Sequence, residues 1–132
     1  MIGTQDLPQD ASGYYFYLLQ YADDSSWKFG VTAYPRRRFQ DLRRCFGRCE
    51  VKGNQREVVR MICVRLENRR VGERLEDALR EMLRPPLKRR NGDRREFFPE
   101  MPESILQWIS DEKRLTSDDA FRFALAIPQQ GD

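Results

Sequence analysis

The hydrophobic pattern along the first half of the chain predicts three β-strands. Residues 14–20 are apolar or aromatic at almost every position, which is typical of a strand buried on both faces. A polar turn at 22–26 separates them from a second apolar run at 27–32, so the two runs form a predicted hairpin. Apolar residues alternate again over 57–66, and we expect one face of this strand to carry Val58, Ile62, Val64 and Leu66.

Helical spacing of apolar residues predicts the remaining elements. A first helix is expected over 35–46, because it begins at a proline and a glycine follows its last residue. The clearest apolar stripe spans 70–84, and shorter helices are expected over 102–109 and 118–125. The order strand, strand, helix, strand, helix, followed by further helices, predicts an α+β domain with an α-rich C-terminal extension.

The length of 132 residues fits a single domain with one real core. We expect a flexible leader over 1–12, a folded domain over 13–99, and a helical extension over 100–132 that packs on the same domain. The first residues are polar and acidic, and no apolar run is long enough to cross a membrane. The sequence therefore predicts a cytoplasmic protein with no membrane partner.

Histidine and cysteine counts narrow the possible chemistry. The chain has no histidine, which excludes Ser-His-Asp and Cys-His catalysis and zinc sites that need histidine. Any acid–base step must therefore use tyrosine, glutamate, aspartate, lysine or arginine. The three cysteines are an odd number, and we expect ordinary buried thiols in a reducing, intracellular setting.

Charge is concentrated in the middle of the chain. Residues 36–95 hold 20 basic and 9 acidic side chains, whereas both flanking segments are acidic. Most of the basic residues are arginines, which bind phosphate through planar, paired contacts, so nucleic acid is the predicted partner. The alternative is a solvated surface that only keeps the protein soluble. The candidate nucleic-acid-binding residues are Arg36, Arg37, Arg43, Arg44, Arg48, Lys88, Arg89, Arg90, Arg94 and Arg95.

Four features of the sequence resemble the GIY-YIG nuclease superfamily. The tripeptide YFY at 15–17 stands where that family has its first signature, and KFG at 28–30 stands at the second. Arg38 and Glu76 match the family's arginine and its metal-binding glutamate. The match covers about residues 13–99. Lysine replaces the tyrosine of the second signature, as in a phage and bacterial branch of that superfamily.

The resemblance implies both a fold and an activity. The fold would be a small three-stranded antiparallel sheet flanked by helices, and the activity a Mg²⁺- or Mn²⁺-dependent endonuclease with DNA as the expected substrate. Glu76 would bind the metal, Arg38 would contact the phosphate, and Tyr17 with Lys28 would act on the attacking water. Tyr15, on the same strand face as Tyr17, and Asn91 are secondary catalytic candidates.

The chemistry of phosphodiester hydrolysis suits these residue types. It needs an activated nucleophile, neutralisation of the phosphate charge and a stabilised leaving oxygen. One carboxylate can hold Mg²⁺ when phosphate oxygens and waters complete the shell, and Glu76 lies at the border of its helix's apolar stripe. Each residue also has a structural interpretation, with Tyr17 in the core and Arg38 and Glu76 as surface charges.

Two other functions remain open from the sequence. The chain could be a nucleic-acid-binding module with little or no cleavage, because Lys28 replaces the second signature tyrosine. It could instead be a regulatory protein whose acidic segment 96–132 contacts another protein or folds over the basic site. Double-strand cleavage by so small a domain would favour a homodimer.

Overall fold

A small sheet with β1 at its centre organises the molecule. The computed structural model describes residues 4–44, 56–83, 97–111 and 114–115. Within them β1 (Tyr15–Tyr21) pairs antiparallel with both β2 (Trp27–Thr32) and β3 (Val58–Leu66). A two-residue strand, β4 (Arg114–Leu115), adds to β3 in parallel, which gives the order β2-β1-β3-β4. The predicted α+β class with three antiparallel strands is confirmed, whereas β4 was not predicted.

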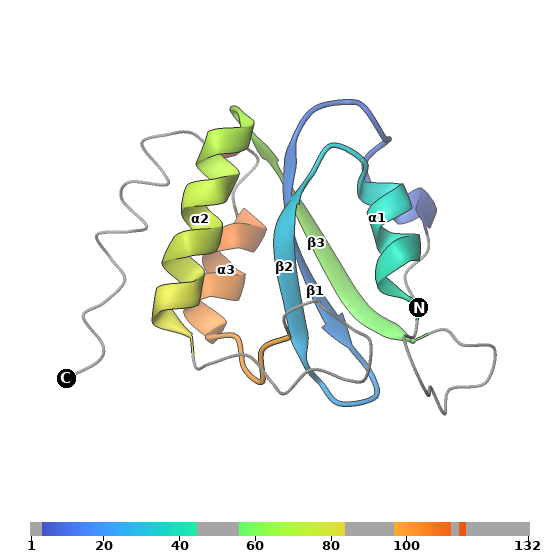
Figure 1. Cartoon of the computed structure of the whole chain (residues 1–132), viewed down its shortest axis with the longest axis vertical. Coiled ribbons are helices and arrows are strands. Elements are labelled where there is room, and N and C mark those ends of the chain that lie inside the picture. Colours follow the sequence, from blue (N-terminus) through green and yellow to red (C-terminus); the bar gives the residue numbers. More distant parts are fainter. Residues whose placement is uncertain (1–3, 45–55, 84–96, 112–113, 116–132) are drawn as a thin grey trace.

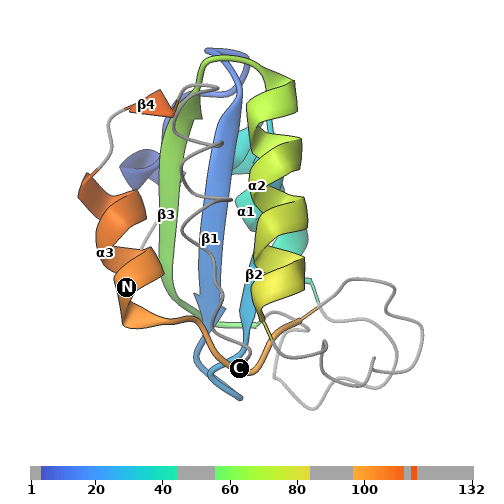
Figure 2. The same cartoon turned by 90° about the vertical axis from the view of Figure 1, so that its left-hand side faces the viewer.

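Helices cover both faces of the sheet (Figure 1). On one side lies α1 (Pro35–Leu42), and on the other lie α2 (Arg69–Met82) and α3 (Glu103–Asp111). Figure 2 shows α2 on the side of β2 and α3 on the side of β3, with β1 and β3 visible between the two helices. The first predicted helix ends earlier than expected, at Leu42, with Arg43 as its C-cap. Residues 45–46 and the predicted helix over 118–125 lie outside the described residues.

Because helices pack on both faces of the sheet, β1 is apolar or aromatic at almost every position. Phe16 and Leu18 are fully buried among the side chains of α2 and α3. Tyr17, Leu19 and Tyr21 are buried on the opposite face, among the side chains of α1. Successive residues of a strand point to opposite faces, so burial on both faces requires an apolar or aromatic residue at every position.

Helix α2 lies unusually close to the sheet. Asn68 caps its first turn by accepting a hydrogen bond from the Val71 N–H at 3.1 Å. A Cβ placed on Gly72 would lie 2.3 Å from Val31 Cγ2 and 2.7 Å from Leu66 Cδ1, which are impossible contacts. Glycine at this position therefore lets the helix backbone approach β2 and β3 closely.

A bulge in β3 corrects one sequence prediction. Gln20 pairs with Arg60 while Tyr21 pairs with Val58, so Val59 has no partner in β1 and is 50 % exposed. The extra residue moves Val58 to the α1 face, among the side chains around Tyr21. The prediction that Val58 shares a face with the other apolar residues of the strand is wrong; that face carries Ile62, Val64 and Leu66.

The described part of the expected leader, residues 4–12, packs against α1. It begins with a single 3-10 turn, η1 (Thr4–Asp6), and Leu7 is buried. Asp10 caps α1 by accepting a hydrogen bond from the Arg36 N–H at 2.8 Å. These contacts fix where α1 begins. Across the described part of the chain, no helix is both long and apolar enough to cross a membrane.

Candidate functional site

The Tyr17 side chain extends from β1 across the neighbouring strand β2, where it passes over Gly30. It pairs with Gly30, and a Cβ on that glycine would lie 2.8 Å from the Tyr17 hydroxyl and 3.0 Å from its ring. Only glycine leaves room for the ring at this position, because any other residue would place a carbon where the phenol lies. The pairing therefore carries the tyrosine hydroxyl from the central strand to a position over the edge strand.

Lys28 brings a positive charge to the same edge. Its Nζ lies 5.9 Å from the centre of the Tyr17 ring and donates a hydrogen bond to the Phe29 carbonyl at 3.0 Å. Trp27, the residue before Lys28, pairs with Phe98 on the outer edge of β2. The Trp27 N–H donates to the Phe98 carbonyl at 2.8 Å, and the Phe98 N–H donates to the Trp27 carbonyl at 2.9 Å. The half-buried lysine thus lies next to the point where this pairing ends.

Glu76 approaches the edge from α2, one helical turn after Gly72. Its side chain is only 19 % exposed, and burial raises the pKa of its carboxyl above the ordinary value. The positive charges of Arg80 and Lys28 oppose this rise. Arg80 Nη2 donates a hydrogen bond to Glu76 Oε2 at 3.3 Å. The glutamate is therefore close enough to Lys28 for their charges to interact.

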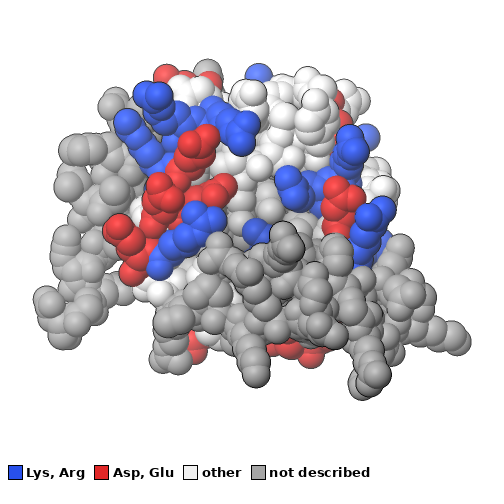
Figure 3. All heavy atoms as spheres, viewed as in Figure 1, with Lys and Arg blue, Asp and Glu red and all other residues white. Residues whose placement is uncertain are grey.

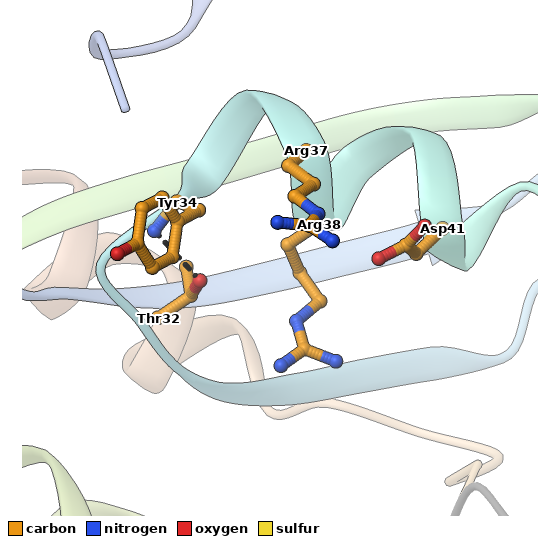
Figure 4. Close-up of a pocket in the computed structure, with 5 residues that line it drawn as sticks. All are labelled: Thr32, Tyr34, Arg37, Arg38 and Asp41. Carbon is orange, nitrogen blue, oxygen red and sulfur yellow. Dashed lines mark hydrogen bonds between the residues drawn. The ribbon is translucent and has the colours of Figure 1, made fainter. Parts of the chain in front are cut away.

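Arg38 lines a pocket between α1 and the end of β2. The pocket has a volume of about 250 Å³, and we call it the α1 pocket; its lining residues are Thr32, Tyr34, Arg37, Arg38 and Asp41. Figure 4 shows the Arg38 side chain extending from α1 toward β2. Within the described ranges, neither Arg37 nor Arg38 has an ion-pair partner. Both guanidinium groups are thus available to an anion.

The structure brings the main sequence candidates to one edge of the sheet. Tyr17 and Lys28 meet over β2, Glu76 approaches from α2, and Arg38 approaches from α1. We call these four residues the β2-edge site. Figure 3 shows this face, with basic and acidic side chains side by side over both α1 and α2.

Tyr15, the secondary tyrosine candidate, lies elsewhere along the strand. It pairs with Thr32, and its hydroxyl is 2.8 Å from the Ser12 Oγ. The structure therefore places Tyr17, and not Tyr15, beside Lys28. Asn91 lies outside the described residues.

The basic residues predicted to bind nucleic acid divide into three groups. Arg37 and Arg44 are exposed on the surface. Arg36 donates hydrogen bonds to the Leu7 carbonyl at 3.1 and 3.2 Å, and Arg43 lies over the Phe39 ring, so both serve the protein's own packing. The remaining candidates fall outside the described residues: Arg48, Lys88, Arg89, Arg90, Arg94 and Arg95.

Arg56 has a structural role that the sequence did not reveal. Its side chain is 2 % exposed, bonds Asp23 at 2.7 Å and Asp24 at 3.1 Å, and lies 3.6 Å from the Tyr21 ring centre. Burial alone would lower the pKa of Arg56, but the two carboxylates outweigh it and raise that pKa. Nothing in the sequence next to Arg56 marks this role, and the acidic pair Asp23 and Asp24 in the hairpin turn is the one signal that could have suggested it.

The described part of the chain contains no preformed group of metal-binding side chains. No three histidine, cysteine, aspartate or glutamate side chains are grouped there. Cys63 is a free thiol whose pKa is raised to about 12 by burial, which makes it unreactive at neutral pH. Cys45 and Cys49 lie outside the described residues.

Comparison with known families corrects the sequence assignment. The family model of the T5orf172 domain matches residues 14–112. This is a different family from the GIY-YIG nuclease superfamily, so that assignment is wrong. Two short tripeptides, one arginine and one glutamate are too few positions to identify a family. No curated protein and no solved structure matches the chain.

Proposed function

We propose that this chain, which belongs to the T5orf172 domain family, is a Mg²⁺- or Mn²⁺-dependent endonuclease that hydrolyses phosphodiester bonds in DNA. The observation that carries the proposal is the β2-edge site. The Tyr17 phenol, the Lys28 ammonium and the largely buried Glu76 carboxylate lie at the β2 edge, and Arg38, which has no ion-pair partner in the described chain, extends toward β2 from α1. Together these groups can position a nucleophile, neutralise the phosphate charge and hold a metal ion, which are functions that phosphodiester hydrolysis needs.

Glu76 is the residue that fits a cation. Mg²⁺ is commonly bound through one or two carboxylates, with substrate phosphate oxygens and waters completing its shell. The contact from Arg80 to Glu76 Oε2, at 3.3 Å, is long for a charged hydrogen bond. A cation bound in place of this contact would compensate the negative charge of the buried carboxylate. When bound, the metal would polarise the phosphate and stabilise the leaving oxygen.

The other three residues act directly on the substrate. Arg38 binds the phosphate and neutralises its charge through its planar guanidinium. Tyr17 orients the attacking water through its hydroxyl, and the Lys28 ammonium lies 5.9 Å from the centre of the Tyr17 ring. The close pairing of Tyr17 with Gly30 holds the hydroxyl in place before substrate binds.

Plasmid cleavage with and without Mg²⁺ tests this proposal. Glu76→Gln removes the charge but keeps the shape of the side chain, and we expect it to slow cleavage by about a hundredfold or more. Glu73→Gln is the matched control, because Glu73 lies on the same helix with a 59 % exposed side chain. Equal cleavage by the Glu76→Gln variant and the unmodified protein would overturn the proposal.

One observation favours a second candidate function, a nucleic-acid-binding module without cleavage. The Glu76 carboxylate already has a partner in Arg80, and the described residues contain no larger group of metal ligands. In that case binding would fall steeply with salt, because arginines displace counterions from phosphates, but Mg²⁺ would produce no cleaved product. We further propose a cytoplasmic location and, for double-strand cleavage, a homodimer.

A further inference from the structure

We propose that the α1 pocket, which Tyr34 lines, is a subsite for an unpaired nucleotide and lies beside the β2-edge site. This inference rests on the proposed nucleic-acid function and specifies its substrate class. Tyr34 lies in the loop between β2 and α1 and is 50 % exposed, although it is a large aromatic residue. It lines the same pocket as Arg37 and Arg38. An exposed ring next to two guanidinium groups can bind both parts of a nucleotide, the base and the phosphate.

The backbone around Tyr34 is held in place. Its N–H donates to the Thr32 Oγ1 at 2.9 Å, and the buried Pro35 follows it as the first residue of α1. On its other side, the Ala33 carbonyl accepts a hydrogen bond from the Ala11 N–H at 2.8 Å. The exposed ring is thus attached to a fixed backbone, so stacking a base on it costs little additional conformational entropy.

Charge within the α1 pocket indicates where the phosphate lies. Figure 4 shows Tyr34 at one end, Asp41 at the other, and the guanidinium groups of Arg37 and Arg38 between them. The Asp41 carboxylate repels a phosphate, so the phosphate is expected at the arginines on the side of Tyr34. A base attached to that phosphate then lies within reach of the exposed ring.

A second pocket continues the path along α1. It has a volume of about 360 Å³ and is lined by Gln40, Asp41, Arg43 and Arg44. Arg43 and Arg44 follow directly after the end of α1 and add positive charge to this pocket, where the Arg43 guanidinium also lies over the Phe39 ring. A nucleic-acid backbone following α1 would therefore meet arginine on both sides of Asp41.

Stacking on Tyr34 selects for unpaired bases. In a continuous duplex both faces of every base are already covered by neighbouring base pairs, so a protein ring can stack only on a base that has left the helix. Single strands, flaps and branch points expose such bases without the cost of unstacking. The preferred substrate is therefore DNA with unpaired nucleotides next to the cleavage point.

Binding to defined oligonucleotides tests this inference. The Glu76→Gln protein is used throughout so that DNA is not cleaved, and fluorescence anisotropy measures binding to a single strand, a flap and a continuous duplex at one salt concentration. We expect the single strand and the flap to bind more tightly than the duplex. Tyr34→Ala should weaken binding to the first two by ~5- to 100-fold, whereas Tyr34→Phe keeps the ring and should bind as before.

Tyr14 provides the matched control. It is 42 % exposed, similar to Tyr34, but it does not line the α1 pocket. Tyr14→Ala should leave binding to all three DNAs unchanged. The inference is overturned if Tyr34→Ala weakens binding no more than Tyr14→Ala does, or if the duplex binds as tightly as the single strand. Failure of every DNA to bind would instead overturn the proposed function itself.

Discussion

The close approach of α2 to the sheet predicts that Gly72 tolerates no added carbon. In Gly72→Ala the new Cβ would lie 2.3 Å from Val31 Cγ2 and 2.7 Å from Leu66 Cδ1. Overpacking of this kind costs ~1–3 kcal/mol, and the value should be near the upper limit because two separate strands are affected. Alanine regains about 1 kcal/mol of helix propensity. The net expected loss in the free energy of unfolding is therefore about 1–2 kcal/mol.

Urea unfolding followed by circular dichroism measures this loss, and a double-mutant cycle identifies its cause. Val31→Ala removes both methyl groups of Val31, which would lie 2.3 and 3.2 Å from the new carbon, and leaves only the contact with Leu66 Cδ1. The double variant should be more stable than the sum of the two single effects predicts, by about 1 kcal/mol or more. A neutral or stabilising Gly72→Ala, or strictly additive effects in the double variant, would refute the packing argument.

Three further predictions concern the rest of the site and its support. Gly30→Ala should displace the Tyr17 ring, since the new carbon would lie 2.8 Å from its hydroxyl, and lower the cleavage rate ~100-fold with the fold retained by circular dichroism. Arg56→Met should cost about 2–3 kcal/mol in urea unfolding, less than a fully buried ion pair because its carboxylate partners stay partly exposed. A stability near that of the unmodified protein would contradict this role for Arg56. Burial raises the pKa of Glu76, so the folded state retains a proton that the unfolded chain loses above about pH 4. The free energy of unfolding should therefore decrease as the pH rises above about 4. Glu76→Gln should remove the Glu76 contribution to this decrease in urea curves recorded from pH ~4 to ~7. The same pH dependence in the variant and the unmodified protein would contradict the raised pKa of Glu76.

Local periodicity was sufficient to predict most of the fold. The two-sided apolar run of β1, the hairpin to β2 and the stripe of α2 all follow from residue spacing within a single element. The misplaced Val58 shows the limit of this reasoning. A single extra residue in β3 reverses the alternation, and the bulge arises from the pairing with β1, which no spacing within β3 reveals.

The site was predicted less completely because its geometry depends on contacts between distant segments. Tyr17 and Tyr15 are equivalent in sequence, and only the pairing of Tyr17 with Gly30 distinguishes them. From the sequence, Arg56 belonged to the basic segment 36–95. In the structure its guanidinium instead pairs with Asp23 and Asp24 in the hairpin turn. Tyr34 was not singled out either, because an isolated tyrosine before a proline carries no signal until its exposure is known.

The central claim is that one strand edge holds both the cation and the scissile phosphate. A crystal of the protein with a flap DNA and Mn²⁺ tests this most directly, because anomalous scattering locates the metal independently of its surroundings. We expect one Mn²⁺ bound by the Glu76 carboxylate, with Arg38 on a DNA phosphate and Tyr17 facing the same phosphate. Mn²⁺ bound away from Glu76, or DNA bound on a face that excludes β2, would contradict it.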